Sequence, residues 1–217
     1  MTSASSTNHP EHRALALALI AATAANDTLA QPASRIVIAV AGESGSGKSV
    51  TAVSLARELT ASGDLTEVLH QDDYFIRPPA ANHAHRAADL TSVGPHEVDF
   101  DRLRAHVAAF RRGERGVAAP RVNYGKDRFD TEPRDFSSVQ ILVVEGTYVL
   151  ASVAADIRIF LAATSDDTRE RRRARNRDIV APVVDQVLAI EHRIIAAQCE
   201  MADIVVDRDF RIVRTGR

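Results

Sequence analysis

Five short apolar runs, rich in β-branched residues, divide the chain. The first, RIVIAVAG at residues 35–42, is continuous and ends in glycine, which is typical of a strand buried on both faces of a parallel sheet. Four similar runs predict four more strands. They cover residues 66–71, 140–146, 156–163 and 202–207.

Helical periodicity fills the intervals between these strands. Residues 48–63 place apolar side chains at Val50, Val53, Leu55 and Leu59, and Gly63 favours an end to that helix. Strands that alternate with helices predict an α/β fold with a five-stranded, mainly parallel sheet flanked by helices. Further helical stretches are expected near residues 99–112, 166–177 and 182–201.

The segment before the first strand is rich in alanine and leucine. We expect a helix over residues 13–30 and a disordered tail over residues 1–12, with the main domain covering residues 31–217. A secretory signal is the alternative, because a positive charge precedes a short apolar run that ends in small residues. No other segment offers about 18 uninterrupted apolar residues, which argues against an integral membrane protein.

Two stretches show little periodicity. Residues 76–98 hold three prolines and several histidines, and residues 113–138 are similarly irregular. Long loops in compact domains are usually functional or disordered. We expect both to be loops on the substrate side, with disorder as the alternative.

Composition is that of an ordinary globular protein. Of the 217 residues, 45% are apolar and 26% are charged, and the formal net charge of −2 argues against a general nucleic-acid scaffold. Cys199 is the only cysteine, which excludes an internal disulfide and fits a reducing compartment, so we expect a cytoplasmic protein. Composition carries no signal for an oligomeric state.

The stretch GESGSGKS at residues 42–49 matches the phosphate-binding loop (P-loop) pattern G-x-x-x-x-G-K-[ST] in full. It lies between a buried strand and a helix, where backbone N–H groups and the helix N-terminus can face phosphates. Lys48 can reach the β- and γ-phosphates, and the Ser49 hydroxyl can bind Mg²⁺. We therefore expect nucleotide binding, with ATP as the default. The expected residues are Gly42, Glu43, Ser44, Gly45, Ser46, Gly47, Lys48, Ser49 and Val50.

The rest of the sequence favours a small-molecule kinase over other nucleotide users. It lacks the N-K-x-D element of a GTPase and the L-S-G-G-Q signature of a transporter ATPase. The stretch HQDDYF, residues 70–75, follows the second expected strand at the edge where ligands bind in open α/β sheets. Asp72 is the candidate for accepting the proton of an attacking hydroxyl, with a simple turn as the alternative. Asp73 is assigned to local structure, and Tyr74 to a substrate contact.

Two further features fit phosphoryl transfer. Glu145 ends an apolar strand near the loop and is a candidate magnesium partner, with a solvent-exposed strand end as the alternative. The run TRERRRARNRD begins at residue 168, where a lid over residues 166–181 would begin. We expect two or three of its arginines, Arg173 and Arg177 above all, to close over the phosphoryl group. The alternatives are a solvated helix face and an arm that binds nucleic acid. The near-neutral net charge of the chain argues against a nucleic-acid arm.

Together these residues resemble the uridine kinase family of P-loop kinases, which is related to nicotinamide riboside kinase, phosphoribulokinase and pantothenate kinase. The resemblance runs from about residue 35 to 207 and is carried by GESGSGKS, HQDDYF, VVEG, the arginine-rich run and ADIVV. It implies ATP-dependent phosphoryl transfer to a hydroxyl group. It also implies Asp72 as the catalytic aspartate and Ser49, Glu145 and Asp72 on the magnesium side.

The acceptor side departs from the family pattern. Uridine kinases have an Asp-His-Pro whose aspartate holds ribose hydroxyls, and here Val93 and Gly94 stand in place of Asp-His. Their base-contacting Tyr-Asp-Phe is replaced by residues 122–124, Val-Asn-Tyr. We expect acceptor contacts from this region, with an ordered surface loop as the alternative. The candidates are Tyr124, Lys126, Asp127, Arg128 and the lid's Arg177.

The resemblance implies a small hydroxylated substrate, most directly a nucleoside, and neither nucleic acid nor membrane as a partner. A sugar, a sugar phosphate or pantothenate is the alternative acceptor. A nucleotide-binding regulator without turnover is a third hypothesis, against which the complete set of Lys48, Ser49, Asp72 and Glu145 argues.

Overall fold

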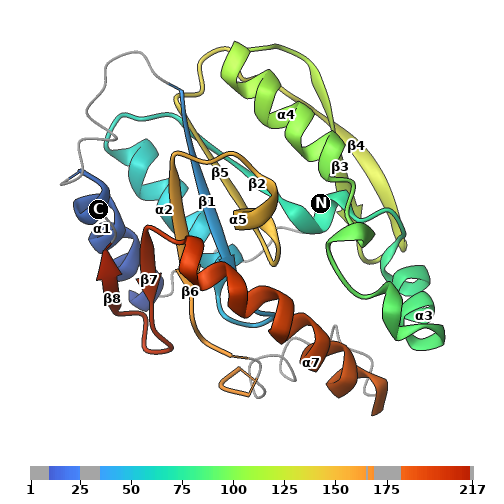
Figure 1. Cartoon of the computed structure of the whole chain (residues 1–217). Helices are drawn as coiled ribbons and strands as arrows, with labels where there is room; N and C mark the ends of the chain where they lie inside the picture. The colour runs from blue at the N-terminus through green and yellow to red at the C-terminus, as the bar shows by residue number, and fades with distance from the viewer. Residues whose placement is uncertain (1–9, 25–34, 165, 169–181, 216–217) are drawn as a thin grey trace.

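The chain folds around a six-stranded sheet (Figure 1), and the computed structural model describes residues 10–24, 35–164, 166–168 and 182–215. The strand order is β2-β5-β1-β6-β7-β8. The first five strands are parallel, and β8 pairs with β7 in the antiparallel direction. The strands are β1 (Ile36–Gly42), β2 (Thr66–His70), β5 (Ile141–Gly146), β6 (Ile157–Leu161), β7 (Ile204–Val206) and β8 (Ile212–Thr215).

The five strands expected from the apolar runs are all present, and the α/β fold with a mainly parallel sheet is confirmed. Strand β1 is buried at every residue, as its continuous apolar sequence predicts. Strand β8 was not expected. It is a short edge strand whose side chains are mostly exposed, so it has no apolar run to reveal it.

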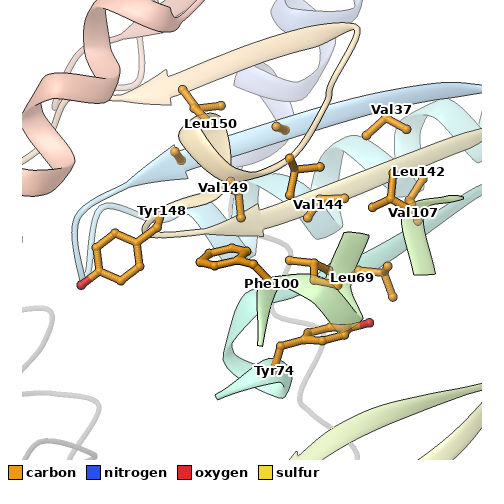
Figure 2. Packing of buried hydrophobic residues seen from close by; sticks show 14 of the residues in the cluster. Val37, Leu69, Tyr74, Phe100, Val107, Leu142, Val144, Tyr148, Val149 and Leu150 are labelled. Atoms are coloured by element: carbon orange, nitrogen blue, oxygen red, sulfur yellow. The ribbon is translucent and has the colours of Figure 1, made fainter. Parts of the chain in front are cut away.

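Helices cover both faces of the sheet, and the alternation of side chains along β1 divides the core between them. Ile38 and Val40 pack on one face with α1 and α2, and Val37 and Ala39 pack on the other. The cluster on the face of Val37 and Ala39 includes Phe100 and Val107 of α4, which Figure 2 shows near Leu142 and Val144 of β5. The helices are α1 (Pro10–Ala24), α2 (Lys48–Ala61), α4 (Phe100–Arg112), α5 (Val149–Ser152), α7 (Pro182–Ala196) and the 3₁₀ helix η4 (Ala197–Met201).

Helix α1 lies against α2 and buries Leu15 and Leu19. Its first turn includes residues 10–12, which were expected to belong to a disordered tail. His12 is buried there, with Nδ1 2.9 Å from Oγ1 of Thr51 in α2. The expected continuation of this helix over residues 25–30 lies outside the described residues.

The two stretches expected to be loops are largely regular. Residues 76–98 contain α3 (Pro79–Ala88) and two 3₁₀ helices, η2 (Leu90–Ser92) and η3 (Pro95–Glu97). Residues 113–138 contain the antiparallel hairpin of β3 (Val117–Asn123) and β4 (Arg128–Arg134). The sequence pattern of these two strands is weak for two reasons. The hairpin is a separate two-stranded sheet with few buried side chains, and each of its strands carries a proline.

Candidate active site

Three functional segments emerge side by side from the carboxyl edge of the sheet. In the register of the sheet, Val40 of β1 pairs with Glu145 of β5, and Glu145 pairs with His70 of β2. The P-loop continues from β1, and the 3₁₀ helix η1 (Gln71–Tyr74) continues from β2. The parallel register therefore brings the P-loop, Glu145 and Asp72 to one edge, as expected for ligand sites in open α/β sheets.

The P-loop needs glycine where it turns into α2. Gly47 has φ of 95°, in the left-handed region, and a Cβ at this position would lie 2.7 Å from Cε1 of His12. A Cβ at Gly42 would lie 2.7 Å from the backbone oxygen of Leu161 in the neighbouring strand β6. The loop is thus closely packed between β6 and the first turn of α1.

Contacts within and around the P-loop fix its path. Lys48 Nζ donates to the Glu43 carbonyl (3.4 Å), and Thr168 Oγ1 donates to the Ser44 carbonyl (2.9 Å). Glu43 Oε1 lies 2.6 Å from Nδ1 of His192 in α7. The Ser46 hydroxyl is fully buried with no hydrogen-bond partner among the described residues, and Ser46 does not line the cleft described below.

Glu145 is a buried carboxylate with one unpaired oxygen. Its Oε1 lies 2.7 Å from Nδ1 of His70, while no described residue hydrogen-bonds its buried Oε2. Burial favours the protonated form, but the His70 hydrogen bond and the Lys48 charge outweigh it and lower the pKa of Glu145. A hydrogen bond from the Ser49 side chain also lowers the pKa of Glu145, so an ionised carboxylate and a hydroxyl, both groups that Mg²⁺ binds, lie together here. The residues present therefore fit a magnesium ion.

The two adjacent aspartates of HQDDYF have different surroundings. Asp72 lines the cleft described below, and its Oδ2 accepts a hydrogen bond from the Tyr124 hydroxyl (3.2 Å). Asp73 is 4% exposed, and its Oδ1 accepts from the backbone N–H of Val122 (2.8 Å). Strand β2 ends at His70, so Asp72 lies in the following 3₁₀ turn and not at the strand end as expected.

Two residues expected to contact substrate are placed elsewhere. Tyr74 is 2% exposed, and its hydroxyl is hydrogen-bonded to Nδ1 of His106 (2.8 Å) in the core (Figure 2). Arg128 is exposed and pairs with Asp130 (2.8 Å) in its own hairpin. Neither lines the cleft. The tight turn of η1 directs Tyr74 inward, which the residue order alone does not indicate.

A cleft of about 620 Å³ joins these parts. The P-loop contributes Ser44, Gly45, Lys48 and Ser49, and Asp72 lies in the same lining. The remaining lining comes from α3, the tip of the β3–β4 hairpin (residues 122–129) and α7, together with Phe75, Arg77 and Thr147. Val50, expected at the nucleotide, is not among the lining residues.

The hairpin tip is attached to the rest of the cleft at two points. Tyr124 donates to Asp72, and Asp127 accepts a hydrogen bond from the backbone N–H of Ala80 at the start of α3 (2.8 Å). Both residues line the cleft, as expected of acceptor-side residues. Asp127 also acts as a helix cap for α3, a role that links two segments 47 positions apart in the sequence.

A buried charge network in the cleft was missed by sequence reasoning. Arg86 of α3 donates to both carboxylate oxygens of Glu97 (2.6 and 2.8 Å) and lies 3.1 Å from Oε1 of Glu191 in α7. The Tyr148 hydroxyl donates to the same Oε1 (3.4 Å). Burial raises the pKa of Glu191, against the charge of Arg86. No local pattern marks this set, because its members come from four separate segments.

The lid arginines Arg173 and Arg177 lie outside the described residues. Within the described ranges no cluster of three His, Cys, Asp or Glu side chains could hold a metal by itself. None of the helices in those ranges is long and apolar enough to cross a membrane.

Comparisons with known proteins agree with this geometry. The model of the "Phosphoribulokinase / Uridine kinase family" matches residues 37–210. A bifunctional α-galactosidase/sucrose kinase of Mediterraneibacter gnavus is 30% identical over 189 residues, 81% of this chain and 20% of that protein. A uridine kinase of Mannheimia succiniciproducens is 29% identical over 117 residues, 53% of each chain. The chain thus spans at most about half the length of these two curated relatives.

A similar fold is found among solved structures. The crystal structure of a putative fructose transport system kinase from Silicibacter sp. TM1040 superimposes with a TM-score of 0.64. The two proteins are 24% identical, and the match covers 84% of this chain and 94% of the other. The similarity supports the fold.

Proposed function

Because the chain belongs to the phosphoribulokinase/uridine kinase family, we propose that it is a small-molecule kinase and transfers the γ-phosphoryl group of ATP to a hydroxyl of a small metabolite. The observation that carries this proposal is that Lys48 and Ser49 of the P-loop line the same cleft as Asp72. A phosphate group on the loop and a hydroxyl beside Asp72 would thus share one enclosed space.

On the nucleotide side, the P-loop backbone and Lys48 bind the phosphates, and Lys48 offsets the charge that develops during transfer. Ser49, Glu145 and Asp72 are the residues that would hold Mg²⁺. When bound, this ion neutralises negative charge on the phosphates. The unpaired Oε2 of Glu145 supports this assignment.

On the acceptor side, Asp72 orients the attacking hydroxyl and accepts its proton. The hydrogen bond from Tyr124 holds Oδ2 of Asp72, which leaves Oδ1 for the acceptor. Arg173 and Arg177 are proposed, from the family resemblance, to close over the transferring phosphoryl group.

Two acceptor classes are supported. The resemblance to uridine kinases favours a nucleoside. A sugar is the second candidate, because the relative named as a sucrose kinase is 30% identical over 81% of this chain. The replacement of the ribose-binding Asp-His by Val93 and Gly94 also favours a different acceptor: Val93 is buried and does not line the cleft.

A coupled assay of ATP consumption, run with Mg²⁺ against nucleosides, sugars, sugar phosphates and pantothenate, tests the proposal. Turnover that needs an acceptor and is lost in Asp72→Asn supports it. Measuring GTP in parallel tests the nucleotide preference. Tight ATP binding without turnover of any acceptor class would instead favour a nucleotide-binding regulator.

A further inference from the structure

Three polar residues from two helices line the same cleft as the P-loop and Asp72: Asn82 and Arg86 of α3, and Glu191 of α7. We call this set the acceptor wall. Glu97, 1% exposed, fixes the guanidinium of Arg86 with two hydrogen bonds of 2.6 and 2.8 Å. The wall is therefore held in place before any acceptor binds, which lowers the entropic cost of binding.

Glu191 retains capacity to bind a ligand. It is 7% exposed, and both of its described contacts, from Arg86 and Tyr148, end on Oε1. That leaves Oε2 for a hydrogen-bond donor from the cleft. A carboxylate oxygen so far out of water is costly unless a donor reaches it, and a substrate hydroxyl is such a donor.

Asn82 provides the second ligand group. It is 7% exposed, lines the cleft, and has a buried Oδ1 with no partner among the described residues. A side-chain amide both donates and accepts hydrogen bonds, as does a hydroxyl. Asn82 and Arg86 are four residues apart and therefore lie on the same face of α3, so together they can bind neighbouring hydroxyls.

The charge of the wall disfavours an anionic group placed against it. Arg86 is the only cation of the set, and the carboxylates of Glu97 and Glu191 both contact it. Within the wall, one guanidinium faces two carboxylates, so a phosphate or carboxylate placed against these residues meets no spare positive charge; the other cations that line the cleft, Lys48 and Arg77, lie outside the wall. A sugar phosphate would bring a further negative charge to Glu191 at the cost of like-charge repulsion.

The hairpin tip has few free hydrogen-bonding groups that could contact the edge of a nucleobase. The Asn123 side chain donates to Asp130 (2.8 Å) and accepts from the backbone of Lys126 (3.1 Å), and Asp127 caps α3. The Tyr124 hydroxyl is engaged by Asp72. These three side chains therefore serve the fold and the catalytic aspartate.

On the premise of the kinase function above, we propose that the acceptor wall of Asn82, Arg86 and Glu191 binds the hydroxyls of an uncharged sugar or sugar alcohol. The same wall disfavours a phosphate group placed against it, and the hydrogen-bonding side chains of Asn123, Tyr124 and Asp127 at the hairpin tip are already engaged within the protein. Asp72 then lies in the same cleft as the hydroxyl that is phosphorylated.

The first test compares kcat/KM of the full chain, with Mg-ATP, for neutral hexoses, pentoses and sugar alcohols against uridine, cytidine and sugar phosphates. A neutral sugar should exceed every nucleoside and every sugar phosphate by about tenfold or more, the factor that one lost hydrogen bond to a charged group commonly costs. A higher value for uridine or for a sugar phosphate overturns the inference and leaves the kinase function intact.

The second test assigns the residues. Glu191→Gln and Asn82→Ala should each raise the KM for the sugar about tenfold or more while the KM for ATP stays within about twofold. Arg193→Gln, an exposed residue on the same helix, is the matched control and should change neither. Unchanged sugar KM in both wall variants, with melting temperatures near that of the parent, would refute the role of the wall.

A binding measurement separates this inference from the proposed function. With a non-hydrolysable ATP analogue and Mg²⁺, calorimetry should detect binding of the preferred sugar to the parent and its loss in Glu191→Gln. Sugar binding without any turnover would support the wall and contradict the kinase function. Neither binding nor turnover of any neutral sugar would contradict the wall.

Discussion

Asp72 and Asp73 are neighbours in sequence, yet Asp72 lines the cleft and Asp73 is buried against the backbone of β3. The 3₁₀ turn that follows β2 separates the two carboxylates. One is available to an acceptor, and the other attaches η1 to the hairpin.

Asp72→Asn should lower kcat by about 100- to 10,000-fold, because the amide keeps the shape but cannot accept the proton. Mg-ATP binding should stay within a few-fold. Asp73→Asn is the matched control and should cost far less activity, since an amide oxygen can still accept from Val122. The reverse ranking, in a coupled assay of both variants, would show that the roles were assigned to the wrong residues.

Lys48→Ala should reduce phosphoryl transfer by about 100- to 1,000-fold or more, because it withdraws a positive charge from the β- and γ-phosphates. The fold should survive, since Lys48 is bonded only weakly to the loop, at 3.4 Å from the Glu43 carbonyl. Steady-state kinetics and a melting curve check both points. Turnover comparable to that of the parent would remove Lys48 from the mechanism.

Glu145→Gln should raise the Mg²⁺ concentration needed for half-maximal activity by about tenfold or more, because the amide is a poorer ligand than the ionised carboxylate. A Mg²⁺ titration at saturating ATP measures this shift. Glu67→Gln is the control, because this carboxylate lies on the same strand as His70 but pairs with Arg134 and does not line the cleft. If the Mg²⁺ dependence is unaltered, Glu145 serves only to hold His70.

Arg173→Ala or Arg177→Ala should lower kcat more than it raises the KM for ATP, as expected of a contact made mainly in the transition state. This prediction rests on the family resemblance and concerns residues outside the described ranges. Single alanine variants across the run test it with one assay. Unchanged kcat in every one of them would make the run a solvated helix face.

His12→Ala should lower the free energy of unfolding by about 1–3 kcal/mol, because a buried hydrogen bond to Thr51 is lost and Thr51 is left unpaired. The imidazole also packs on the Phe210 ring, with 4.4 Å between ring centroids. Denaturant unfolding measures the change. Leu17→Ala, on the exposed side of α1, is the control and should be nearly neutral.

The phosphoryl-transfer side could be predicted from sequence because its signals are local. A strand buried on both faces is a continuous apolar run, and the P-loop needs glycine at fixed spacing. Glu145 is marked by its place near the end of such a strand, and Asp72 by its place shortly after the half-buried strand β2. His70 ends β2, but its contact with Glu145 is made across the sheet and leaves no mark in either segment.

The acceptor side could be predicted only in part. Helix α3 and the β3–β4 hairpin are polar and small, so their burial leaves no clear period. The ion pair of Arg86 with Glu191 joins residues more than 100 positions apart, and only the folded chain brings them together. Tyr74 shows the opposite error: a residue two positions from the catalytic candidate is directed into the core.

The separation of the six-stranded sheet from α3 and the β3–β4 hairpin has a consequence for how the family can acquire new acceptors. Glu145 is locked to the P-loop by backbone pairing with β1, so an insertion or deletion within these strands would move the carboxylate to the opposite face. Helix α3 and the β3–β4 hairpin are not part of the six-stranded sheet. Their length and side chains can therefore change without disturbing its strand pairing. Under the proposed function, new acceptors can therefore be acquired by changes in α3 and the hairpin, while the residues proposed for phosphoryl transfer stay in place.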